Sequence, residues 1–394
     1  MVLTPVDPNE RFRLRRQERA RSKRKRQVVA VAGSAMLIAG ASGFAFAVTH
    51  RPAEVAFVAT AAAKPKAKPK LVVPQPRPLP AEVRGVHVTM ALASIAGRLE
   101  EYMTIPGLNT IELDVKDESG RVGFVGAAPA LARSTGAAGR YYDPRRAVEL
   151  SHRHGTYLIG RIVCFEDPVV AAKQPRFAIR TTDGGVWRTR GGLAWANPYN
   201  REYWDYIVDV GTAAARAGFD EIQLDYVRFP TDGDLTSALF PGKRAEPAAT
   251  TIAAFIRYVS TRLRAEHVRV SADVFGLSAA RDLGIGQLPR RIGPYLDAVY
   301  PMVYPSHYSS GEYQLPDPSA RPGLTVARSL ADFRDRLRGQ RAKLIPWLQD
   351  FSLGRTYTIE DVRAQISAAR AAGSAGFMLW NAGGVYTSDV LRGP

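Results

Sequence analysis

The sequence predicts an α/β fold, a (β/α)8 TIM barrel, and three observations carry this prediction. From Val83 onward, short β-prone runs alternate with amphipathic helical segments, which is the spacing of repeated βα units around a parallel sheet. There are eight such runs. The span of roughly 310 residues fits a closed barrel, and the absence of a glycine-rich phosphate loop argues against an open doubly wound sheet.

The elements follow from periodicity. Alternation of apolar and polar residues marks the strands, and apolar residues at helical spacing mark the helices. The expected strands are Arg84–Thr89, Thr110–Lys116, Tyr157–Phe165, Glu221–Val227, Val268–Val274, Ala298–Tyr304, Lys343–Gln349 and Gly376–Trp380. The expected helices are Pro144–His154, Arg201–Ala217, Thr250–Glu266, Val326–Arg338 and Ile359–Ala372, with a short final one at Ser388–Arg392.

Three different segments precede the barrel, which is expected over residues 83–394. Residues 1–27 form a basic tail, and residues 28–49 form an uncharged run long enough to cross a bilayer as one helix. Residues 50–82 are rich in Ala, Pro and Lys, a composition typical of an extended linker. The basic tail predicts a cytoplasmic N-terminus and a barrel outside the cytoplasm, in the membrane-anchored form.

A cleaved signal peptide is the alternative for the apolar run. The tripeptide Ala45-Phe46-Ala47 fits a signal-peptidase site, so cleavage near Ala47 would give a secreted protein. The run is longer than the usual signal-peptide core, and we therefore favour an uncleaved anchor. Either form places the barrel outside the cytoplasm.

The formal net charge of +17 is unevenly distributed. Residues 1–27 carry about +7 and residues 50–80 about +5, which leaves about +5 for the rest of the chain. Such a nearly balanced barrel argues against binding to a nucleic acid backbone. No histidine or cysteine pattern has metal-ligand spacing, so we expect neither a metal nor a cofactor.

Acids and aromatic residues recur where the predicted strands end. Carboxylates can transfer protons and aromatic rings can stack on pyranose faces, so these strand ends predict a cleft for a carbohydrate substrate. Two long insertions, Pro168–Asn197 after the third strand and Thr231–Pro247 after the fourth, are expected to form walls of this cleft.

Glycosidic bond cleavage usually requires one ionised and one protonated carboxyl group. Asp225 ends the fourth strand with Arg228 three residues later, and a guanidinium nearby would lower a carboxyl pKa, so Asp225 is the candidate ionised partner. Asp273 on the neighbouring strand is the candidate acid/base, with Glu166 as its rival. The other acids considered for that role are Asp114, Asp117 and Asp350.

Further strand-end residues are candidate substrate contacts. Parity turns Glu112, Asp114 and Lys116 of the second strand and Asp273 of the fifth toward the barrel axis. Parity is ambiguous for the third strand, and Arg161 is placed inward by its polarity. Parity turns Tyr226 toward the helices. The substrate-binding candidates are Asp114, Lys116, Arg228, Tyr304, His307, Trp347, Gln349, Trp380 and Asn381, of which Trp347 and Trp380 are expected to stack on sugar rings.

Long ungapped strings of the chain resemble a known family. They are Leu108–Asp117, Arg161–Pro168, Trp195–Asn200, Gly218–Pro230 (GFDEIQLDYVRFP), Ala272–Gly276, Tyr300–Tyr308 and Pro346–Phe351. In these strings the chain resembles a bacterial family of glycosyl hydrolase domains of unknown function with a TIM-barrel fold. The resemblance covers about Arg84 to Tyr386.

The resemblance also implies a role for one acid. The barrel is similar to those of α-amylase and α-galactosidase enzymes, in which the aspartate of strand four is the nucleophile of a retaining mechanism, and that position is Asp225 here. The acid/base of that pattern is a glutamate on strand five, where this chain has Asp273. A chitinase-type mechanism would need a glutamate at Val227.

Two functions follow from these features. The first is an exported, membrane-tethered glycoside hydrolase that acts on a polysaccharide or oligosaccharide. The second is a non-catalytic barrel that binds carbohydrate or associates with the cell wall. The geometry of Asp225 with Asp273 or Glu166 distinguishes them.

Overall fold

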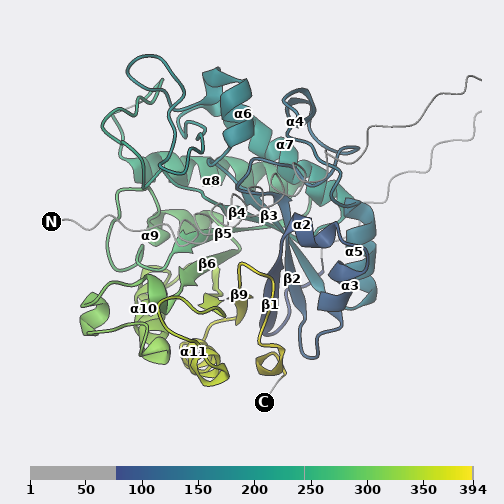
Figure 1. The fold of residues 1–394 in the computed structure, drawn as a ribbon, viewed down its shortest axis with the longest axis vertical. Coiled ribbons are helices and arrows are strands. Elements are labelled where there is room, and N and C mark those ends of the chain that lie inside the picture. Colours follow the sequence, from purple (N-terminus) through teal and green to yellow (C-terminus); the bar gives the residue numbers. More distant parts are fainter. Residues whose placement is uncertain (1–76, 244, 393–394) are drawn as a thin grey trace, which may run out of the picture. The chain divides into compact units, whose positions relative to one another are not determined.

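The computed structural model describes residues 77–392 except residue 244, and these residues form a closed parallel β-barrel surrounded by helices (Figure 1). Neighbouring strands follow the order β5-β4-β3-β2-β1-β9-β8-β6-β7, and pairing of β5 with β6 closes the barrel. The strands are β1 (Val83–Val88), β2 (Thr110–Lys116), β3 (Tyr157–Val163), β4 (Glu221–Asp225), β5 (Arg269–Phe275), β6 (Ala298–Val303), β7 (Lys343–Leu344), β8 (Trp347–Gln349) and β9 (Gly376–Trp380). The predicted (β/α)8 barrel is confirmed.

Most connections between strands contain α-helices. Their bounds are α2 (Met90–Ala93), α3 (Arg98–Met103), α4 (Ala130–Ser134), α5 (Pro144–Arg153), α6 (Pro168–Lys173), α7 (Arg201–Ala217), α8 (Ala248–Ala265), α9 (Pro289–Ile292), α10 (Pro322–Arg336) and α11 (Ile359–Ala371). Short 3-10 helices lie at η1 (Pro175–Phe177), η2 (Gly293–Tyr295), η3 (Pro305–His307), η4 (Glu312–Gln314) and η5 (Ser388–Val390). The last of these is the short element expected at the end of the chain.

Local signals explain where the main helices begin and end. Asn200 accepts a hydrogen bond from the Tyr203 amide at the start of α7, and Gly218 ends that helix with φ of 107°. Thr358 and Asp361 form a capping box at the start of α11. These signals lie in the sequence, which is why the predicted helix bounds differ from the observed ones by only a few residues.

The seventh barrel strand is split. The run predicted as one strand, Lys343–Gln349, forms β7 and β8 with Ile345 and Pro346 between them. Proline has no amide hydrogen to donate to a ladder. The amide of Ile345 still donates to the Val299 carbonyl over 3.1 Å, so the strand follows β6 across the break.

The fourth strand is shorter than predicted. It ends at Asp225 rather than Val227, because Tyr226 has φ of 49° and turns the chain out of the strand. The change of direction puts Asp225 at the last position of the strand, at the carboxyl end of the barrel. In barrels of this class that end carries the active site.

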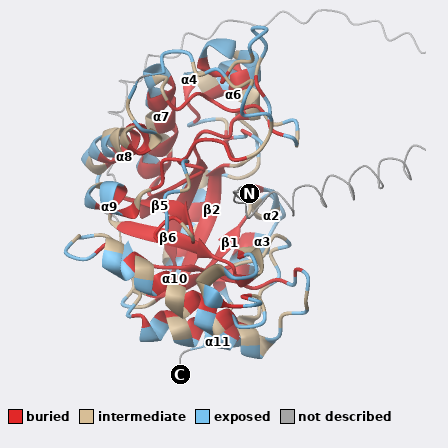
Figure 2. Ribbon diagram, turned by 90° about the vertical axis from the view of Figure 1, so that its left-hand side faces the viewer, coloured by how far each residue is buried: buried red, intermediate tan, exposed pale blue. Residues whose placement is uncertain are grey.

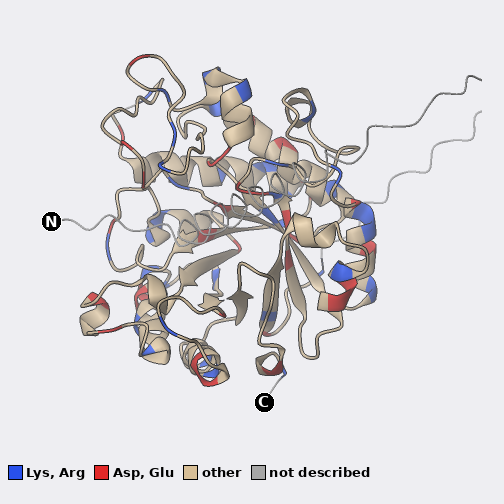
Figure 3. Ribbon diagram, viewed as in Figure 1, with Lys and Arg blue, Asp and Glu red and all other residues tan. Residues whose placement is uncertain are grey.

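Alternation along the strands directs apolar side chains into the core between the sheet and the helices, and polar side chains into the barrel interior. Ile222, Leu224 and Val270 are fully buried against the helices, as parity predicts, and Tyr226 is buried in the same core. Figure 2 shows most of the sheet as buried, and most exposed residues lie on the outer faces of the helices and in loops. Charges of both signs are interspersed on those outer faces (Figure 3).

The two long insertions are joined to each other by backbone hydrogen bonds. The Arg180 amide donates to the Leu239 carbonyl over 2.9 Å, and the Leu239 amide donates back to Arg180 over 2.7 Å. The Trp187 indole also donates to the Asp234 carbonyl. Residues of the third and fourth βα connections therefore form one body beside the barrel.

The segments predicted at residues 1–27 and 28–49, and most of the predicted linker, lie outside the described residues. In the part that is described, no helix has both the length and the apolar character needed to cross a bilayer.

Candidate active site

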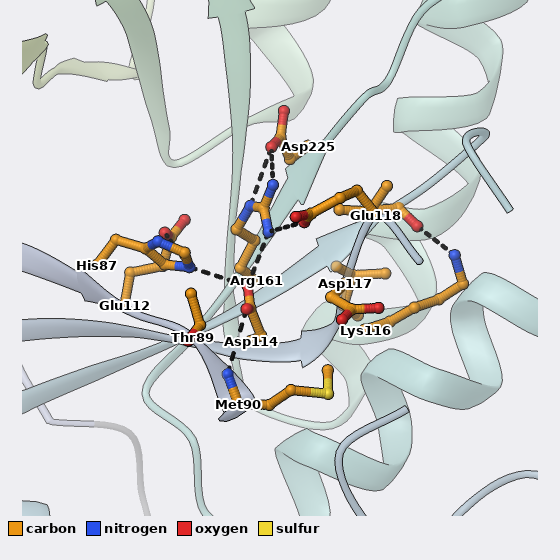
Figure 4. A network of polar contacts seen from close by, with 12 residues as sticks. His87, Thr89, Met90, Glu112, Asp114, Lys116, Asp117, Glu118, Arg161 and Asp225 are labelled. Atoms are coloured by element: carbon orange, nitrogen blue, oxygen red, sulfur yellow. Dashed lines mark hydrogen bonds and ion pairs between the residues drawn. The ribbon is translucent and has the colours of Figure 1, made fainter. Parts of the chain in front are cut away.

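Asp225 lies at the end of β4 and is held by Arg161 from β3 (Figure 4). Its Oδ2 accepts hydrogen bonds from Arg161 Nε over 2.9 Å and Nη2 over 2.7 Å, and its Oδ1 accepts one from the Tyr226 amide over 2.7 Å. Only 4% of the residue is exposed. A carboxyl group that only accepts, and accepts from a guanidinium, has the environment of an ionised carboxylate.

The same arginine connects Asp225 to Asp114 on β2. Arg161 Nη1 donates to Asp114 Oδ1 over 2.7 Å, and His87 Nε2 lies 2.9 Å from that oxygen. Burial alone would raise the pKa of Asp114, but the nearby His87 and Arg161 outweigh it and hold this pKa below the ordinary range of aspartate. His87, which appeared isolated in the sequence, therefore belongs to a buried network of polar contacts with Asp114 and Arg161.

Asp273 on β5 lies in a different environment. Its Oδ1 accepts hydrogen bonds from Gln223 Nε2 over 2.5 Å and from Trp347 Nε1 over 2.7 Å. Burial, and next the negative charge of Asp225, raise its pKa well above the usual value. Within residues 77–392, apart from residue 244, no group bonds its Oδ2, so that oxygen can carry a proton.

Glu112 on β2 is a second acid with a raised pKa. It is fully buried, and burial followed by the charge of Asp273 raises its pKa well above the ordinary value. Its Oε1 has no hydrogen-bond partner among the described residues, and its Oε2 lies 3.8 Å from His87 Nε2. Parity placed Glu112 in the interior, but no sequence feature marked it as a functional acid.

The pKa values of Asp114, Glu112 and Asp273 are shifted in different directions because few cations lie near these acids. Four buried carboxyl groups, those of Glu112, Asp114, Asp225 and Asp273, interact with one guanidinium, that of Arg161. Arg161 bonds two of them directly. Neighbouring carboxylates repel each other in a medium of low dielectric constant, and together with burial this raises the pKa values of the other two, Glu112 and Asp273. The site thus places carboxyl groups bonded to a guanidinium beside carboxyl groups with raised pKa values.

Aromatic rings gather at the ends of β6, β8 and β9. Tyr304 lies 5.6 Å from Trp380 and 5.5 Å from His307, and Phe351 lies 5.3 Å from Trp380, measured between ring centroids. The Tyr304 pKa is raised well above its usual value by burial and then by the charges of Asp273 and Asp225. Tyr304 therefore joins this aromatic cluster to the acids.

Two predicted contacts differ from what the structure shows. The guanidinium at Asp225 is that of Arg161, whereas Arg228 lies over the rings of Trp195, Tyr226 and Phe275 at 4.9–5.0 Å and donates to the Phe229 carbonyl. Trp347, expected to stack on a sugar, is buried and uses its indole to bond Asp273. In both cases a residue from another strand reaches the acid.

The remaining candidates bond within the protein. Lys116 donates to the Val163 carbonyl over 2.7 Å and pairs with Asp167 over 3.2 Å. Gln349 accepts from the Ser306 amide and donates to the Phe351 carbonyl, and Asn381 donates to the Asp350 carbonyl over 2.5 Å. These bonds fix the loops at the barrel mouth. Their roles in binding substrate stay predictions.

The rival acids lie outside the group around Arg161. Glu166 is buried beyond the end of β3, where its backbone pairs with Trp195 of the first insertion. Asp117 accepts hydrogen bonds from the amides of Ser119 and Arg121 in a turn, and burial followed by the charge of Glu118 raises its pKa to about 6. Asp350 accepts from Thr387 near the end of the chain.

The described residues offer no group of three or more His, Cys, Asp or Glu side chains arranged to hold a metal ion. A search among curated proteins finds no match.

Solved structures include several similar barrels. The glycoside hydrolase domain of PgaB (BpsB) from Bordetella bronchiseptica is 14% identical, with 79% of this chain and 99% of that chain covered and a TM-score of 0.58. The C-terminal domain of a "putative chitinase" from Desulfitobacterium hafniense is 11% identical, with coverage of 79% and 97% and a TM-score of 0.50. At these identities the likeness concerns the fold alone.

A hypothetical protein from Ruminiclostridium thermocellum is 34% identical over 48% of this chain and 97% of that chain, with a TM-score of 0.43. The family match is broader, because residues 85–386 match the family described as "Putative glycosyl hydrolase domain". This range contains every strand from β2 to β9, most of β1, and each acid of the site. The chain therefore belongs to this glycosyl hydrolase domain family.

Proposed function

We propose that the protein hydrolyses O-glycosidic bonds of a polysaccharide or oligosaccharide. The observation that carries this proposal is the pair formed by Asp225 and Asp273 on adjacent strands, one bonded twice to a guanidinium and the other with a raised pKa. In this mechanism Asp273 protonates the leaving oxygen, and Asp225 acts as the nucleophile or as the ionised carboxylate that activates water.

Other groups of the site orient this pair. Trp347 and Gln223 hold Asp273 Oδ1, so the proton resides on Oδ2. Arg161 fixes Asp225 Oδ2, and the Tyr226 amide fixes Oδ1. The aromatic cluster of Tyr304, His307, Phe351 and Trp380 supplies faces on which a pyranose ring could stack.

The test is a panel of polysaccharides incubated with the purified full-length protein, with new reducing ends as the measurement. We expect Asp225→Asn and Asp273→Asn each to lower turnover at least about 100-fold, since a positioned acid or base contributes about 10²–10⁴-fold. Glu166→Gln tests the rival acid/base. Asp209→Asn, at an exposed acid on α7, is the matched control and should keep full activity.

The anomeric form of the first product distinguishes the two roles of Asp225. Retention supports a nucleophile, and inversion supports a general base. Equal turnover by wild type and Asp225→Asn would remove Asp225 from the mechanism. If a glycan binds saturably but no glycan of the panel is hydrolysed, the result would instead support the carbohydrate-binding function.

We also propose that residues 28–49 tether the barrel to the membrane with the barrel outside the cytoplasm. The uncharged run after a basic tail supports this proposal. Recovery of the full-length chain in the membrane fraction, with the barrel accessible to external protease, is the expected result. A soluble product that begins just after Ala47 would show cleavage instead.

A further inference from the structure

A cavity lies outside the acid cluster, in the connection between β2 and α5. It has a volume of about 550 Å³ and is lined by residues 124–127 and 140–145. Cavities of about 300–1,000 Å³ are typical of small-ligand sites. We call this space the loop cavity.

Two tyrosine rings form a rigid part of its wall. A Cβ atom on Gly139 would lie 2.5 Å from the Tyr141 ring, and one on Gly123 would lie 2.5 Å from the Tyr142 ring. Each ring therefore packs directly on glycine backbone, which no larger residue would permit. Phe124 packs edge-on against Tyr142 at 6.1 Å between centroids. Aromatic rings held in this way are suited to stacking on a sugar.

Two arginines that line the loop cavity make no side-chain bond to another described residue. Arg140 and Arg145 are exposed, and no carboxylate or carbonyl bonds either guanidinium among the described residues. Other arginines of this connection are engaged, since Arg121 donates to the Gly136 carbonyl and Arg133 to that of Ala128. Two free guanidinium groups thus face the same space.

The one acid of the lining is committed elsewhere. Asp143 Oδ1 accepts the amides of Arg145 over 2.9 Å and Arg146 over 3.1 Å, as the N-cap of α5. Its single charge leaves an excess of positive charge beside the tyrosines. Guanidinium groups bind carboxylates with two parallel hydrogen bonds, which gives both affinity and orientation.

We propose that the loop cavity binds a carboxylate-bearing sugar unit and is an outer subsite for an acidic glycan. This inference rests on the proposed function, because it assigns a substrate class to the same barrel. The connection to the site is direct: the Tyr142 hydroxyl donates to the Asp114 carbonyl over 2.9 Å, and Asp114 bonds the arginine that holds Asp225. Arg140 and Arg145 bind the carboxylate, and Tyr141 contacts the ring.

The test measures binding by calorimetry in the full-length Asp225→Asn protein, so that hydrolysis of the probe does not contribute to the measured heat. The probes are a galacturonate tetrasaccharide and its fully methyl-esterified form, which has the same rings without the charges. We expect saturable binding of the acid and at least about tenfold weaker binding of the ester, as for loss of a charge-assisted contact. Adding Arg140→Gln and Arg145→Gln together should weaken acid binding by about tenfold or more.

Arg146→Gln is the matched control, since it removes the same charge one residue further along α5, outside the lining of the loop cavity. It should change affinity by less than about twofold. The proposal is overturned if acid and ester bind equally, if neither binds, if the double variant binds normally, or if Arg146→Gln weakens binding as much as the double variant. Binding without any hydrolysis in the glycan panel would overturn the proposed function and keep this subsite.

Discussion

Replacing Arg161 with methionine tests the electrostatic reasoning on which the site depends. The guanidinium makes three bonds of 2.7–2.9 Å, two to Asp225 and one to Asp114, and all three residues are buried. Methionine keeps an unbranched apolar stem but carries no charge, so Arg161→Met would leave Asp225 without the guanidinium that bonds it and Asp114 with His87 alone beside it. Removal of one partner from a buried ion pair costs about 3–5 kcal/mol, which is the expected loss in free energy of unfolding at neutral pH.

The direction of the Asp114 pKa shift determines how the destabilisation by Arg161→Met depends on pH. The folded pKa of Asp114 lies below its ordinary value, so this group stabilises the fold above its unfolded pKa, near 4, and the stabilisation is lost as pH falls through the folded value. In Arg161→Met that pKa rises. The difference in stability between wild type and variant should therefore be largest at neutral pH and shrink below about pH 4.

Urea denaturation followed by fluorescence at several pH values measures this difference. Arg216→Met is the matched control, because Arg216 also bonds a carboxylate twice, that of Glu266, but on the surface. An exposed pair contributes about 1 kcal/mol or less. If Arg161→Met costs no more than Arg216→Met, or if its cost does not change with pH, the description of Arg161 as the cation of this site is incorrect.

Three more substitutions test other parts of the structure. Glu112→Gln should leave stability near pH 4 within about 0.5 kcal/mol of wild type and give a more stable protein at pH 7, because an acid whose folded pKa is raised costs stability as pH rises from its unfolded pKa, about 4.3, toward the folded value; denaturation at both pH values measures this. Trp347→Phe removes a hydrogen bond that lowers the pKa of Asp273, so the alkaline limb of the pH–rate profile should move to higher pH while kcat falls roughly tenfold. An unchanged profile would exclude this role of Trp347. Gly376→Ala should cost about 3 kcal/mol in urea denaturation, since φ is 126° and a Cβ would lie 2.1 Å from the Val83 carbonyl oxygen; a cost below about 1 kcal/mol would show that the β1–β9 pair can shift.

Strand alternation predicted much of the fold and part of the site. It turned Glu112, Asp114 and Asp273 toward the axis, because side-chain direction in a strand depends on local spacing alone, whereas Arg161 was placed inward by its polarity. It could not predict which cation reaches which acid. Arg228 is three residues from Asp225 in sequence, yet Arg161, 64 residues away, bonds it, because β3 and β4 are neighbours in the barrel.

The direction in which each pKa shifts could not be predicted from the sequence either. Glu112 and Asp114 are two residues apart on β2, but their pKa values shift in opposite directions. The cause is the position of a guanidinium and an imidazole relative to each carboxyl group, which depends on side-chain conformations from three strands. The turn at Tyr226 was missed for a related reason, because a positive φ at tyrosine has no signature in composition.

The hydrogen bonds between Arg180 and Leu239 have a consequence for how this barrel can diversify. Because each insertion supplies the edge partner of the other, shortening one would expose unpaired backbone groups in its neighbour. Relatives that alter one of these insertions should therefore gain or lose both together. A chimaera that transfers either one must carry residues 168–197 and 231–247 as one unit.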